Sequence, residues 1–470
     1  MPVPVISVAQ MREWEKATWA SGQTEEAVMR RAGEAVARRA EQLTRAGELI
    51  LVFAGKGHNG DDARFAAESI SARDVRLFRV TDPDLTANQL PSVIAHQPAL
   101  IIDGLFGIGL NRPLARNWIQ LIRRINQTGR PILAVDVPSG LNADTGMPLD
   151  DAIRARVTLC FGAVKQGLLK ASSWPFVGRL ETAPEIGLIA YPFKTEISVV
   201  AADDFADFPP PRPVSAHKGT FGHLFIIAGS LGYHGASVLA ARGAQRAQPG
   251  LITLATAPNV YEPVARQTQS VMVTPWTADL APPSTCTAIV IGPGLAAGDI
   301  PEYLILFCRK LWQESSLPTI VDASALDWLV PGPGPKNALR VITPHPGEAA
   351  RLLQISTGEV QRDRGQSLRQ LSGRLGNCFV VLKGHQTMIG RSTGDLLVNC
   401  SGNPYLAQGG SGDLLAGYLG GLLAQPALQK AADKTIPYAV WQHGAAADML
   451  SATKSNWTVE DLAEVLGSVR

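Results

Sequence analysis

The stretch GGSGD, residues 409–413, runs directly into the apolar helical pattern Leu414–Ala424, and this loop and helix decide the fold of the second half of the chain. Glycines let the backbone turn tightly with several N–H groups pointing inward, and the helix adds its positive N-terminal end. Such a loop binds a phosphate or a developing negative charge. Asp413, at its mouth, can act as a general base toward a hydroxyl. An ordinary helix-capping aspartate is the alternative.

Short apolar runs elsewhere in this half predict the strands of a parallel sheet, whose carboxyl ends bind ligands. The predicted strands are Leu224–Ala228, Leu251–Thr256, Ala288–Ile291, Thr319–Asp322, Val341–Thr343 and Phe379–Leu382. Lys383 ends the last run, and Thr387 follows as a donor that could reach nucleotide phosphates. His345 lies between two prolines, in a rigid turn that presents its imidazole. The alternatives are a solvated strand end for Lys383 and a structural role for His345.

The first half repeats this pattern, so the whole chain is predicted to be α/β. The predicted strands are Leu49–Phe53, Val75–Val80, Leu100–Asp103, Ile132–Asp136 and Arg156–Phe161, nearly all apolar, as for strands covered on both faces. Polar and glycine-rich loops follow three of them, at residues 54–62, 103–109 and 136–140. These loops predict a ligand site at the carboxyl edge of the sheet.

A proline-rich seam separates the two halves. Residues 209–211 are all proline and Pro213 follows, a stretch that can continue neither a helix nor a central strand. We place the boundary near Pro210, with one domain over residues 1–208 and the other over residues 209–470.

Composition limits the classes of function. The 470 residues are 46% apolar and 18% charged, and the net charge of +2 without a long basic block disfavours a nucleic-acid binder. The five cysteines are widely spaced without a C-x-x-C pair, which disfavours a disulfide framework or a zinc site. No signal peptide or membrane-spanning run is apparent. We therefore expect a cytoplasmic enzyme with small-molecule partners and no membrane contact.

The second half resembles the dehydratase domain of the NAD(P)H-hydrate repair enzymes, which are relatives of ribokinase. The matching stretches, in family order from about Val214 to Arg470, are KGTFGH at 218–223, AGS at 228–230 with Gly235-Ala236, GPG at 292–294, TPHPGE at 343–348, VLKG at 381–384 and Gly412-Asp413. The resemblance implies a ribokinase-like αβα sandwich. One departure is Gln408, where the family usually has threonine.

The resemblance also implies the reaction and its residues. The family dehydrates the hydrates of NADH and NADPH, NADHX and NADPHX, with ADP or ATP as phosphoryl donor and Mg²⁺ as a candidate metal. Asp413 would be the catalytic base. Substrate contacts would be Ala236, Gly294, His345 and Asp413. Nucleotide contacts would be Lys383, Gly384, His385, Gln386, Thr387, Gly410, Ser411 and Gly412.

The first half resembles the epimerase domain often fused to this dehydratase. The matching stretches are MRRAG at 29–33, residues 55–62, DGLFG at 103–107 and VDVPSGL at 135–141. The resemblance implies a Rossmann-like αβα sandwich, a potassium ion held by Asn59, Asp103 and Ser139, and Asp136 as the acid/base that interconverts the two hydrate epimers. Asp136 as a strand-end cap is the alternative. Substrate contacts would be His58, Asn59, Gly60, Asp61, Asp62, Gly107 and Asp136.

The loop in this half departs from the family pattern. The family reads NNGGDG where this chain has HNGDDA at residues 58–63. If Asp61 must adopt a left-handed backbone, the strain is about 1–2 kcal/mol. Its charge about 4 Å from a substrate phosphate would cost about 4 kcal/mol at intermediate dielectric. We therefore expect Asp61 and Ala63 to impair the epimerase.

Two other functions remain open from the sequence. A ribokinase-like vitamin or sugar kinase would use the same glycine loop and base to phosphorylate a stable alcohol. The first half would then be a non-catalytic binding or oligomerisation module. In either case we expect a homo-oligomer.

Overall fold

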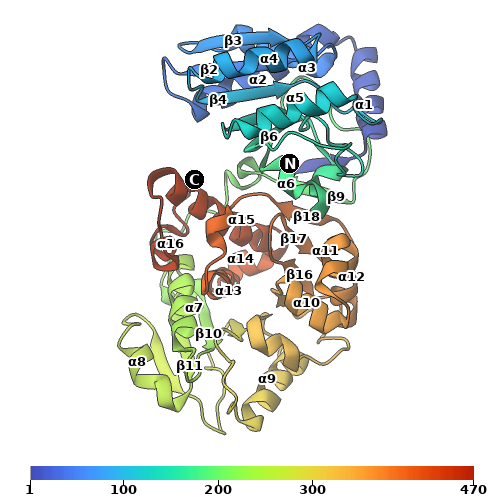
Figure 1. Ribbon diagram of the computed structural model, residues 1–470. Coiled ribbons are helices and arrows are strands. Elements are labelled where there is room, and N and C mark those ends of the chain that lie inside the picture. Colours follow the sequence, from blue (N-terminus) through green and yellow to red (C-terminus); the bar gives the residue numbers. More distant parts are fainter. Residues whose placement is uncertain (1, 470) are drawn as a thin grey trace. The chain divides into compact units, whose positions relative to one another are not determined.

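The computed structural model describes residues 2–469, which fold into two compact units. Val3–Val199 forms one unit, and Val200 onward forms the other. Figure 1 colours the first unit blue to green and the second from green to red. The predicted boundary near Pro210 and the assignment of domains on either side of it stay a prediction.

The N-terminal unit is built on a six-stranded parallel sheet in the order β3-β2-β4-β5-β6-β8. The strands are β2 (Leu49–Ala54), β3 (Asp74–Arg79), β4 (Leu100–Gly104), β5 (Ile132–Val135), β6 (Val157–Phe161) and β8 (Arg179–Ala183). The chain passes from the central β2 to β3 on one side and then to β4 on the other. The carboxyl ends of β2 and β4 therefore open a crevice between their loops, where open α/β sheets bind ligands.

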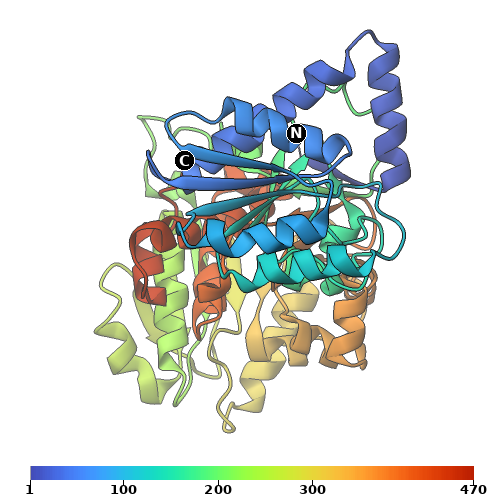
Figure 2. The same ribbon diagram turned by 45° about the horizontal axis from the view of Figure 1, so that its top comes forward.

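Helices cover both faces of this sheet, because successive strand residues point to opposite sides. Ile50 and Val52 pack with α2 (Glu25–Leu43) and α3 (His58–Ser69). Leu51 and Phe53 pack with α4 (Pro83–Ile94) and α5 (Arg116–Gln127). Figure 2 shows α4 and α5 on one side of the strands. The predicted αβα arrangement is confirmed in this unit.

One strand differs from the expectation that every strand is covered on both faces. The edge strand β3 alternates apolar with charged residues, and its side chains are only half-buried or exposed. An edge strand has one neighbour and less helix above it, so the charged residues at its ends, Asp74 and Arg79, stay in water.

A smaller set of elements completes the N-terminal unit. Strand β1 (Val3–Ile6) pairs parallel with β7 (Val164–Lys165) and antiparallel with β9 (Ile197–Val200). Helix α1 (Val8–Ala20) begins with a capping box between Ser7 and Gln10. Short helices follow β7: η1 (Gln166–Leu169), η2 (Ala171–Ser173) and α6 (Trp174–Val177).

The C-terminal unit has a mostly parallel sheet in the order β12-β11-β10-β13-β14-β15-β16-β17-β18. Its strands are β10 (His223–Ile227), β11 (Leu251–Thr256), β12 (Met272–Pro275), β13 (Ala288–Ile291), β14 (Thr319–Val321), β15 (Arg340–Ile342), β16 (Phe379–Leu382), β17 (Thr387–Gly390) and β18 (Leu396–Asn399). The last two pair antiparallel and were not predicted. The chain reverses its direction of strand addition between β10 and β13, which gives this unit a second crevice.

The helices of this unit complete its sandwich. They are α7 (His234–Ala247), α8 (Tyr261–Ala265), α9 (Glu302–Glu314), α10 (Pro346–Leu353), α11 (Thr357–Arg362), α12 (Arg364–Arg374), α13 (Ser411–Leu423), α14 (Pro426–Lys430), α15 (Ala432–Thr453) and α16 (Val459–Val465), with 3₁₀ helices η3 (Ala202–Phe205), η4 (Lys218–Phe221), η5 (Pro258–Val260), η6 (Ala323–Trp328) and η7 (Pro404–Leu406). Within residues 2–469, no helix is both long and apolar enough to cross a bilayer.

Glycines let α13 lie directly against α7. A side-chain carbon at Gly417 would come within 1.8 Å of the Ala240 carbonyl oxygen, and one at Gly243 within 2.1 Å of the Leu414 oxygen. The two backbones therefore touch, and this contact fixes the start of α13 beside the sheet.

Candidate active sites

The crevice of the C-terminal unit brings together two of the predicted substrate contacts. Ala236 lies in the first turn of α7, after β10, and Gly294 follows β13. Gly294 has a φ of +67°, and a side-chain carbon there would lie 2.9 Å from the Ala236 Cβ and 2.4 Å from the Tyr233 oxygen. Only glycine fits this junction, so the two loops meet at the reversal of strand order.

The glycine loop forms the start of α13, as the sequence predicts. Gly410 caps the helix with a φ of +94°, and Ser411 and Gly412 form its first turn. The Ser411 Oγ lies 3.4 Å from Nε2 of His443, a buried residue of α15. Burial lowers the pKa of His443 to about 4, so its imidazole is neutral at pH 7. His443 therefore contacts Ser411 of the glycine loop without adding a positive charge.

Asp413 follows the loop and faces a buried ion pair. The Lys383 Nζ donates to the Asp322 carboxylate at 2.6 Å, and Thr343 donates to the same oxygen at 2.7 Å. A side-chain carbon at Gly412 would lie 3.2 Å from that Nζ, so the ammonium adjoins the glycine loop. Lys383 is thus paired rather than being a solvated strand end.

The surroundings of Asp413 raise its pKa to about 6. Burial is the largest cause, the Asp322 carboxylate adds to it, Lys383 opposes it, and Glu348 raises it further. For Lys383, burial opposes the charge, yet the carboxylates of Asp322, Glu348 and Asp413 raise its pKa. Asp413 is therefore poised to exchange a proton near neutral pH, which an ordinary exposed cap would not do.

His345 caps α10 through its ring. Its Nδ1 accepts from the amides of Gly347 at 3.0 Å and Glu348 at 3.3 Å, while the buried Glu348 carboxylate accepts from the His345 amide at 2.7 Å. The rest of the imidazole is exposed, with 53% of the side chain accessible. The capping role is structural, and Nε2 lies 3.5 Å from Glu348 Oε1, so the predicted substrate contact of His345 stays a prediction.

The predicted nucleotide contacts at residues 383–387 form the tight turn between β16 and β17. Gly384 and Gln386 have positive φ angles of 128° and 54°, and the Thr387 hydroxyl donates to the Gly384 oxygen at 2.9 Å. Burial and the nearby Arg364 lower the pKa of His385. The Thr387 hydroxyl therefore closes the turn itself, and its predicted contact with a phosphate stays a prediction.

Gln408, the departure from the family pattern, holds the approach to the glycine loop. Its Nε2 donates to the Tyr405 oxygen at 2.7 Å and the Trp457 oxygen at 3.3 Å. The side chain therefore bonds to backbone oxygens of η7 and of the segment before α16.

The crevice of the N-terminal unit holds a cavity of about 1140 Å³. The predicted substrate contacts that line it are His58, Asn59, Asp62, Gly107 and Asp136, whereas Gly60 and Asp61 do not. Glu15 of α1 also lines it, and burial raises the Glu15 pKa. Four carboxylate residues therefore line the cavity, Glu15, Glu25, Asp62 and Asp136.

Asp136 is held by a buried lysine. The Lys165 Nζ, wholly buried, donates to Asp136 Oδ1 at 2.5 Å and to the Phe161 and Ala163 oxygens at 3.2 Å each. The Phe161 amide donates to Oδ1 at 3.0 Å. Asp136 also has a φ of +61°, a strained conformation that is concentrated at functional sites. The carboxylate thus bonds to Lys165 and a neighbouring strand, and this differs from a strand-end cap.

The three predicted potassium ligands form one buried network. The Ser139 hydroxyl donates to Asp103 at 2.7 Å, the Ser139 amide donates to the same carboxylate at 2.9 Å, and the Asn59 Nδ2 donates to the Phe106 oxygen at 2.9 Å. Burial raises the Asp103 pKa to about 6, hydrogen bonds from Ser139 and Leu105 oppose this, and no cationic side chain of residues 2–469 contributes. A buried carboxylate without a countercharge, among amide, hydroxyl and carbonyl oxygens, fits a monovalent cation.

The steric expectation for the altered loop is wrong. Residues 58–69 are helical from the start, so Asp61 keeps an ordinary helical backbone and carries no left-handed strain. The Asp61 carboxylate pairs with Arg64, whose positive charge partly offsets the negative charge of Asp61. Ala63 is fully buried against Gly104, whose missing side chain leaves room for it.

The structure also places the other two predicted contacts of this loop. His58 is exposed and contacts Glu25 at 3.3 Å. Gly60 is required, because a side-chain carbon there would lie 2.1 Å from the Gly55 oxygen.

Four site residues escaped the sequence interpretation. Asp322 ends a predicted strand and could have been found as a carboxylate at the carboxyl edge. Lys165, Glu15 and His443 gave no such signal. Each lies on an element remote in sequence from its partner, and only the tertiary structure brings it to the site.

Two family models match the chain. One, described as NAD(P)H-hydrate dehydratase, matches residues 224–467, and the other, described as YjeF-related protein N-terminus, matches residues 25–91 and 80–167. The bifunctional NAD(P)H-hydrate repair enzyme Nnr of Coxiella burnetii is 36% identical over 441 residues, covering 88% of this chain and 89% of its own. The enzyme of that name from Escherichia coli is 33% identical, covering 90% and 85%. The chain belongs to this family of bifunctional NAD(P)H-hydrate repair enzymes.

A solved structure supports the fold of the C-terminal unit. A ribokinase-like superfamily protein from Enterococcus faecalis superposes with a TM-score of 0.50 at 24% identity, covering 59% of this chain and 96% of its own. The predicted ribokinase-like fold is confirmed. Family membership over both halves does not favour the alternative of a vitamin or sugar kinase with an unrelated N-terminal module.

Proposed function

We propose that this chain repairs hydrated NADH and NADPH, with a nucleotide-dependent dehydratase in the C-terminal unit and an epimerase in the N-terminal unit. The observation that carries the dehydratase is the position of Asp413. It lies in the first turn of α13, after a glycine loop, beside a lysine that is mostly buried, and with a pKa raised to about 6. This combination of base, amides and ammonium suits phosphoryl transfer to a hydroxyl.

The proposed reaction has two steps. Asp413 takes the proton of the ring hydroxyl as its oxygen attacks the terminal phosphorus of ADP or ATP, and the shortened nucleotide leaves. The ring nitrogen lone pair then expels phosphate, and loss of a neighbouring C–H proton restores the dihydronicotinamide. Phosphorylation is needed because hydroxide is a poor leaving group.

The other C-terminal residues bind and orient. Amides of residues 410–412 and the helix end would stabilise the transferring phosphoryl group. The ammonium of Lys383, held by Asp322, would lie beside it, and the turn through residue 387 would contact the nucleotide. Ala236, Gly294 and His345 would contact the hydrated substrate. Within residues 2–469, no three His, Cys, Asp or Glu side chains are grouped to hold a metal, so Mg²⁺ would enter with the nucleotide phosphates.

The N-terminal unit would interconvert the two epimers in its cavity. Asp136, held in place by its hydrogen bond from Lys165, would exchange the substrate hydroxyl proton. Potassium on Asn59, Asp103 and Ser139 would balance the Asp103 charge and fix the loop of Gly107 that lines the cavity. We further propose a cytoplasmic homo-oligomer, which sedimentation and cell fractionation would test.

Product fate tests the dehydratase. Purified protein incubated with hydrated NADH and ADP should restore the absorbance of the dihydronicotinamide and release phosphate. A stable phosphorylated product without that recovery would indicate a kinase and contradict the proposal. Asp413→Asn serves as the inactive comparison.

Epimer exchange without nucleotide tests the N-terminal unit. Exchange should be faster with potassium than with a bulky organic cation, and Asp136→Asn should abolish it. Exchange no faster than in protein-free buffer would leave the unit as a non-catalytic module and overturn this half of the proposal.

A further inference from the structure

The N-terminal cavity contains a carboxylate that the proposed role of Asp136 leaves unused. Asp62 lies on α3, lines the cavity and is only 8% exposed. Its Oδ1 is buried and has no hydrogen-bond partner among residues 2–469. Buried polar atoms in proteins are nearly always paired, and a buried carboxyl oxygen without a partner costs less in the neutral acid than in the carboxylate.

The groups that face Asp62 offer it no countercharge. They are Asp136 after β5, Lys165 on β7, Glu15 on α1 and Asp61 on its own helix. An ammonium has three donors, and those of Lys165 are taken by Asp136 and two backbone oxygens. Burial raises the Asp62 pKa well above its usual range, and the three carboxylates add to this, while Lys165 opposes it. The cavity thus holds one carboxylate, Asp136, that is paired with a lysine, and a second, Asp62, whose raised pKa favours the protonated form.

We propose that Asp62 is a second catalytic residue of this site, a carboxylic acid that gives its proton to the substrate while Asp136 accepts one. The inference rests on the proposed epimerase function and deepens it. Two carboxylates whose surroundings favour opposite protonation states are the usual arrangement for paired acid and base catalysis. The difference between the two carboxylates comes from the buried Lys165, which donates to Asp136.

The step balances within one cycle. The hydrated ring carbon bears a hydroxyl and the ring nitrogen. Asp136 takes the hydroxyl proton, the O–H electrons form a carbonyl, and the carbon–nitrogen bond breaks. Its electron pair takes the proton of Asp62. Rotation about the adjacent carbon–carbon bond presents the other carbonyl face, and the reverse steps close the ring and return both protons. No co-reactant is consumed.

Kinetics of Asp62→Asn test the acid role. The amide keeps the shape of the carboxyl but transfers no proton. We expect epimerisation kcat to fall about 10²–10³-fold, in the range for loss of a general acid, with KM changed less than about threefold. Dehydration by the other unit should be unchanged. Asp74→Asn, on the exposed edge strand with 57% of the side chain accessible, is the matched control and should behave as wild type.

The pH profile separates an acid from a structural residue. The wild-type rate should fall at high pH as Asp62 loses its proton, and Asp62→Asn should lack that limb at its lower rate. Glu15→Gln should move the limb to lower pH, because one carboxylate that raises the Asp62 pKa is gone. A uniform drop that keeps the limb, or a rate within threefold of wild type, would overturn the inference.

Infrared spectroscopy gives a readout that needs no activity. At neutral pH the difference spectrum of wild type minus Asp62→Asn should contain the carbonyl stretch of a protonated carboxylic acid. Its absence in an active wild-type enzyme would overturn the inference about Asp62 alone. Lack of epimerisation in the wild type would instead overturn the proposed function of this unit.

Discussion

Both units place an aspartate–lysine pair at the carboxyl edge of a parallel sheet, but the proposed role of the pair differs between the units. In the N-terminal unit Lys165 bonds to Asp136, the proposed catalytic carboxylate itself. In the C-terminal unit Lys383 bonds to Asp322, and the proposed base Asp413 stands beside the pair. A lysine can thus bind the proposed catalytic carboxylate directly, or pair with a neighbouring carboxylate beside it. Burial and neighbouring charges, more than residue type, assign acid and base roles.

The largest expected effect is on dehydration, and it tests the proposed base Asp413. Asp413→Asn should lower the dehydration kcat by about 10³–10⁴-fold, because the amide cannot accept the hydroxyl proton. Binding of ADP, followed by calorimetry, should be retained, and epimerisation is the internal control. A variant with more than a tenth of wild-type activity would remove Asp413 from the role of base.

Removing either lysine should destabilise the protein, and more so at Lys165. Lys165→Met and Lys383→Met each leave a buried carboxylate unpaired, at a cost of about 3–5 kcal/mol. Lys165 is wholly buried, whereas 19% of the Lys383 side chain is accessible, so water compensates more in the second case. Denaturant unfolding of each unit checks the order. The double variants with Asp136→Asn or Asp322→Asn should recover much of the loss, and equal single and double effects would contradict the pairing.

The dehydratase should lose activity in acid. Asp413 must be ionised to act as base, and its pKa is raised to about 6, so kcat/KM should fall about tenfold per pH unit below that value. Glu348→Gln keeps the helix cap but removes one carboxylate that raises this pKa. The acid limb should then move to lower pH, and an unmoved limb would show that another group titrates.

The same pKa predicts a stability gain. A folded-state pKa above the unfolded value means that ionised Asp413 costs stability at pH 7, and that this cost declines as pH falls below about 6 and is gone below the unfolded value of 3.8. Asp413→Asn should therefore stabilise the C-terminal unit by about 1–2 kcal/mol at pH 7 and by almost nothing at pH 4. Thermal unfolding at the two pH values measures the difference. A loss of stability at pH 7 would contradict the sign.

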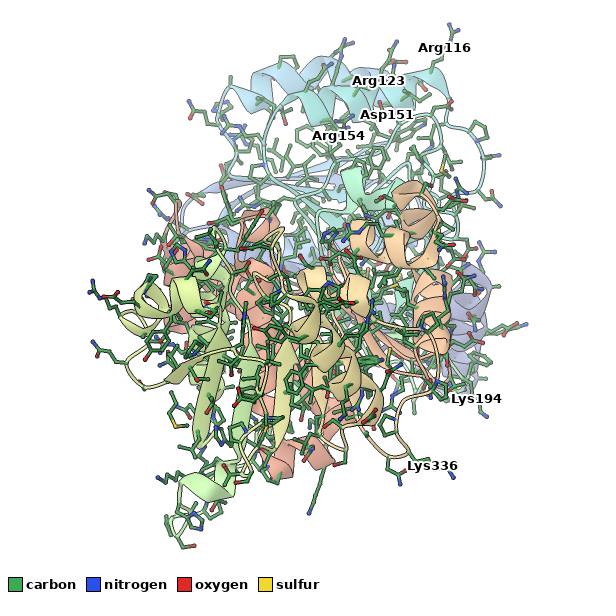
Figure 3. The ribbon with its side chains drawn as sticks, turned by 90° about the horizontal axis from the view of Figure 1, so that it is seen from below. Arg116, Arg123, Asp151, Arg154, Lys194 and Lys336 are labelled. Atoms are coloured by element: carbon green, nitrogen blue, oxygen red, sulfur yellow. The ribbon has the colours of Figure 1, made fainter. Side chains whose placement is uncertain are left out.

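The smallest effect serves as the surface reference. Figure 3 labels Arg123 and Asp151 on the N-terminal unit, whose side chains form an ion pair at 2.9 Å with 57% of the arginine accessible. Arg123→Ala should change stability by less than about 1 kcal/mol, since exposed pairs are screened by water and salt. A larger change would mean that the buried pairs do not differ from an exposed pair in their contribution to stability.

Most of the central strands could be predicted from local sequence. Most predicted strands in both halves match observed strands to within one or two residues, because strands buried on two faces are short apolar runs. Local sequence patterns failed where packing against other parts of the chain determines the backbone conformation. The first turn of the helix from His58 was interpreted as a loop, and the strands β8, β12, β17 and β18 were not predicted. Helical packing against Gly55 and Gly104 gives Asp61 an ordinary backbone that its sequence context did not indicate.

The sequence by itself determined the order of the strands along the chain and which polar loops follow them, including the loop before Asp413 and the one after Ile132–Val135. Only the tertiary structure decided the charge states. Glu15, Lys165 and His443 come from elements far along the chain from the groups they affect, and burial sets how strongly each acts. Protonation depends on distance and dielectric in space, and neither quantity is written in residue order.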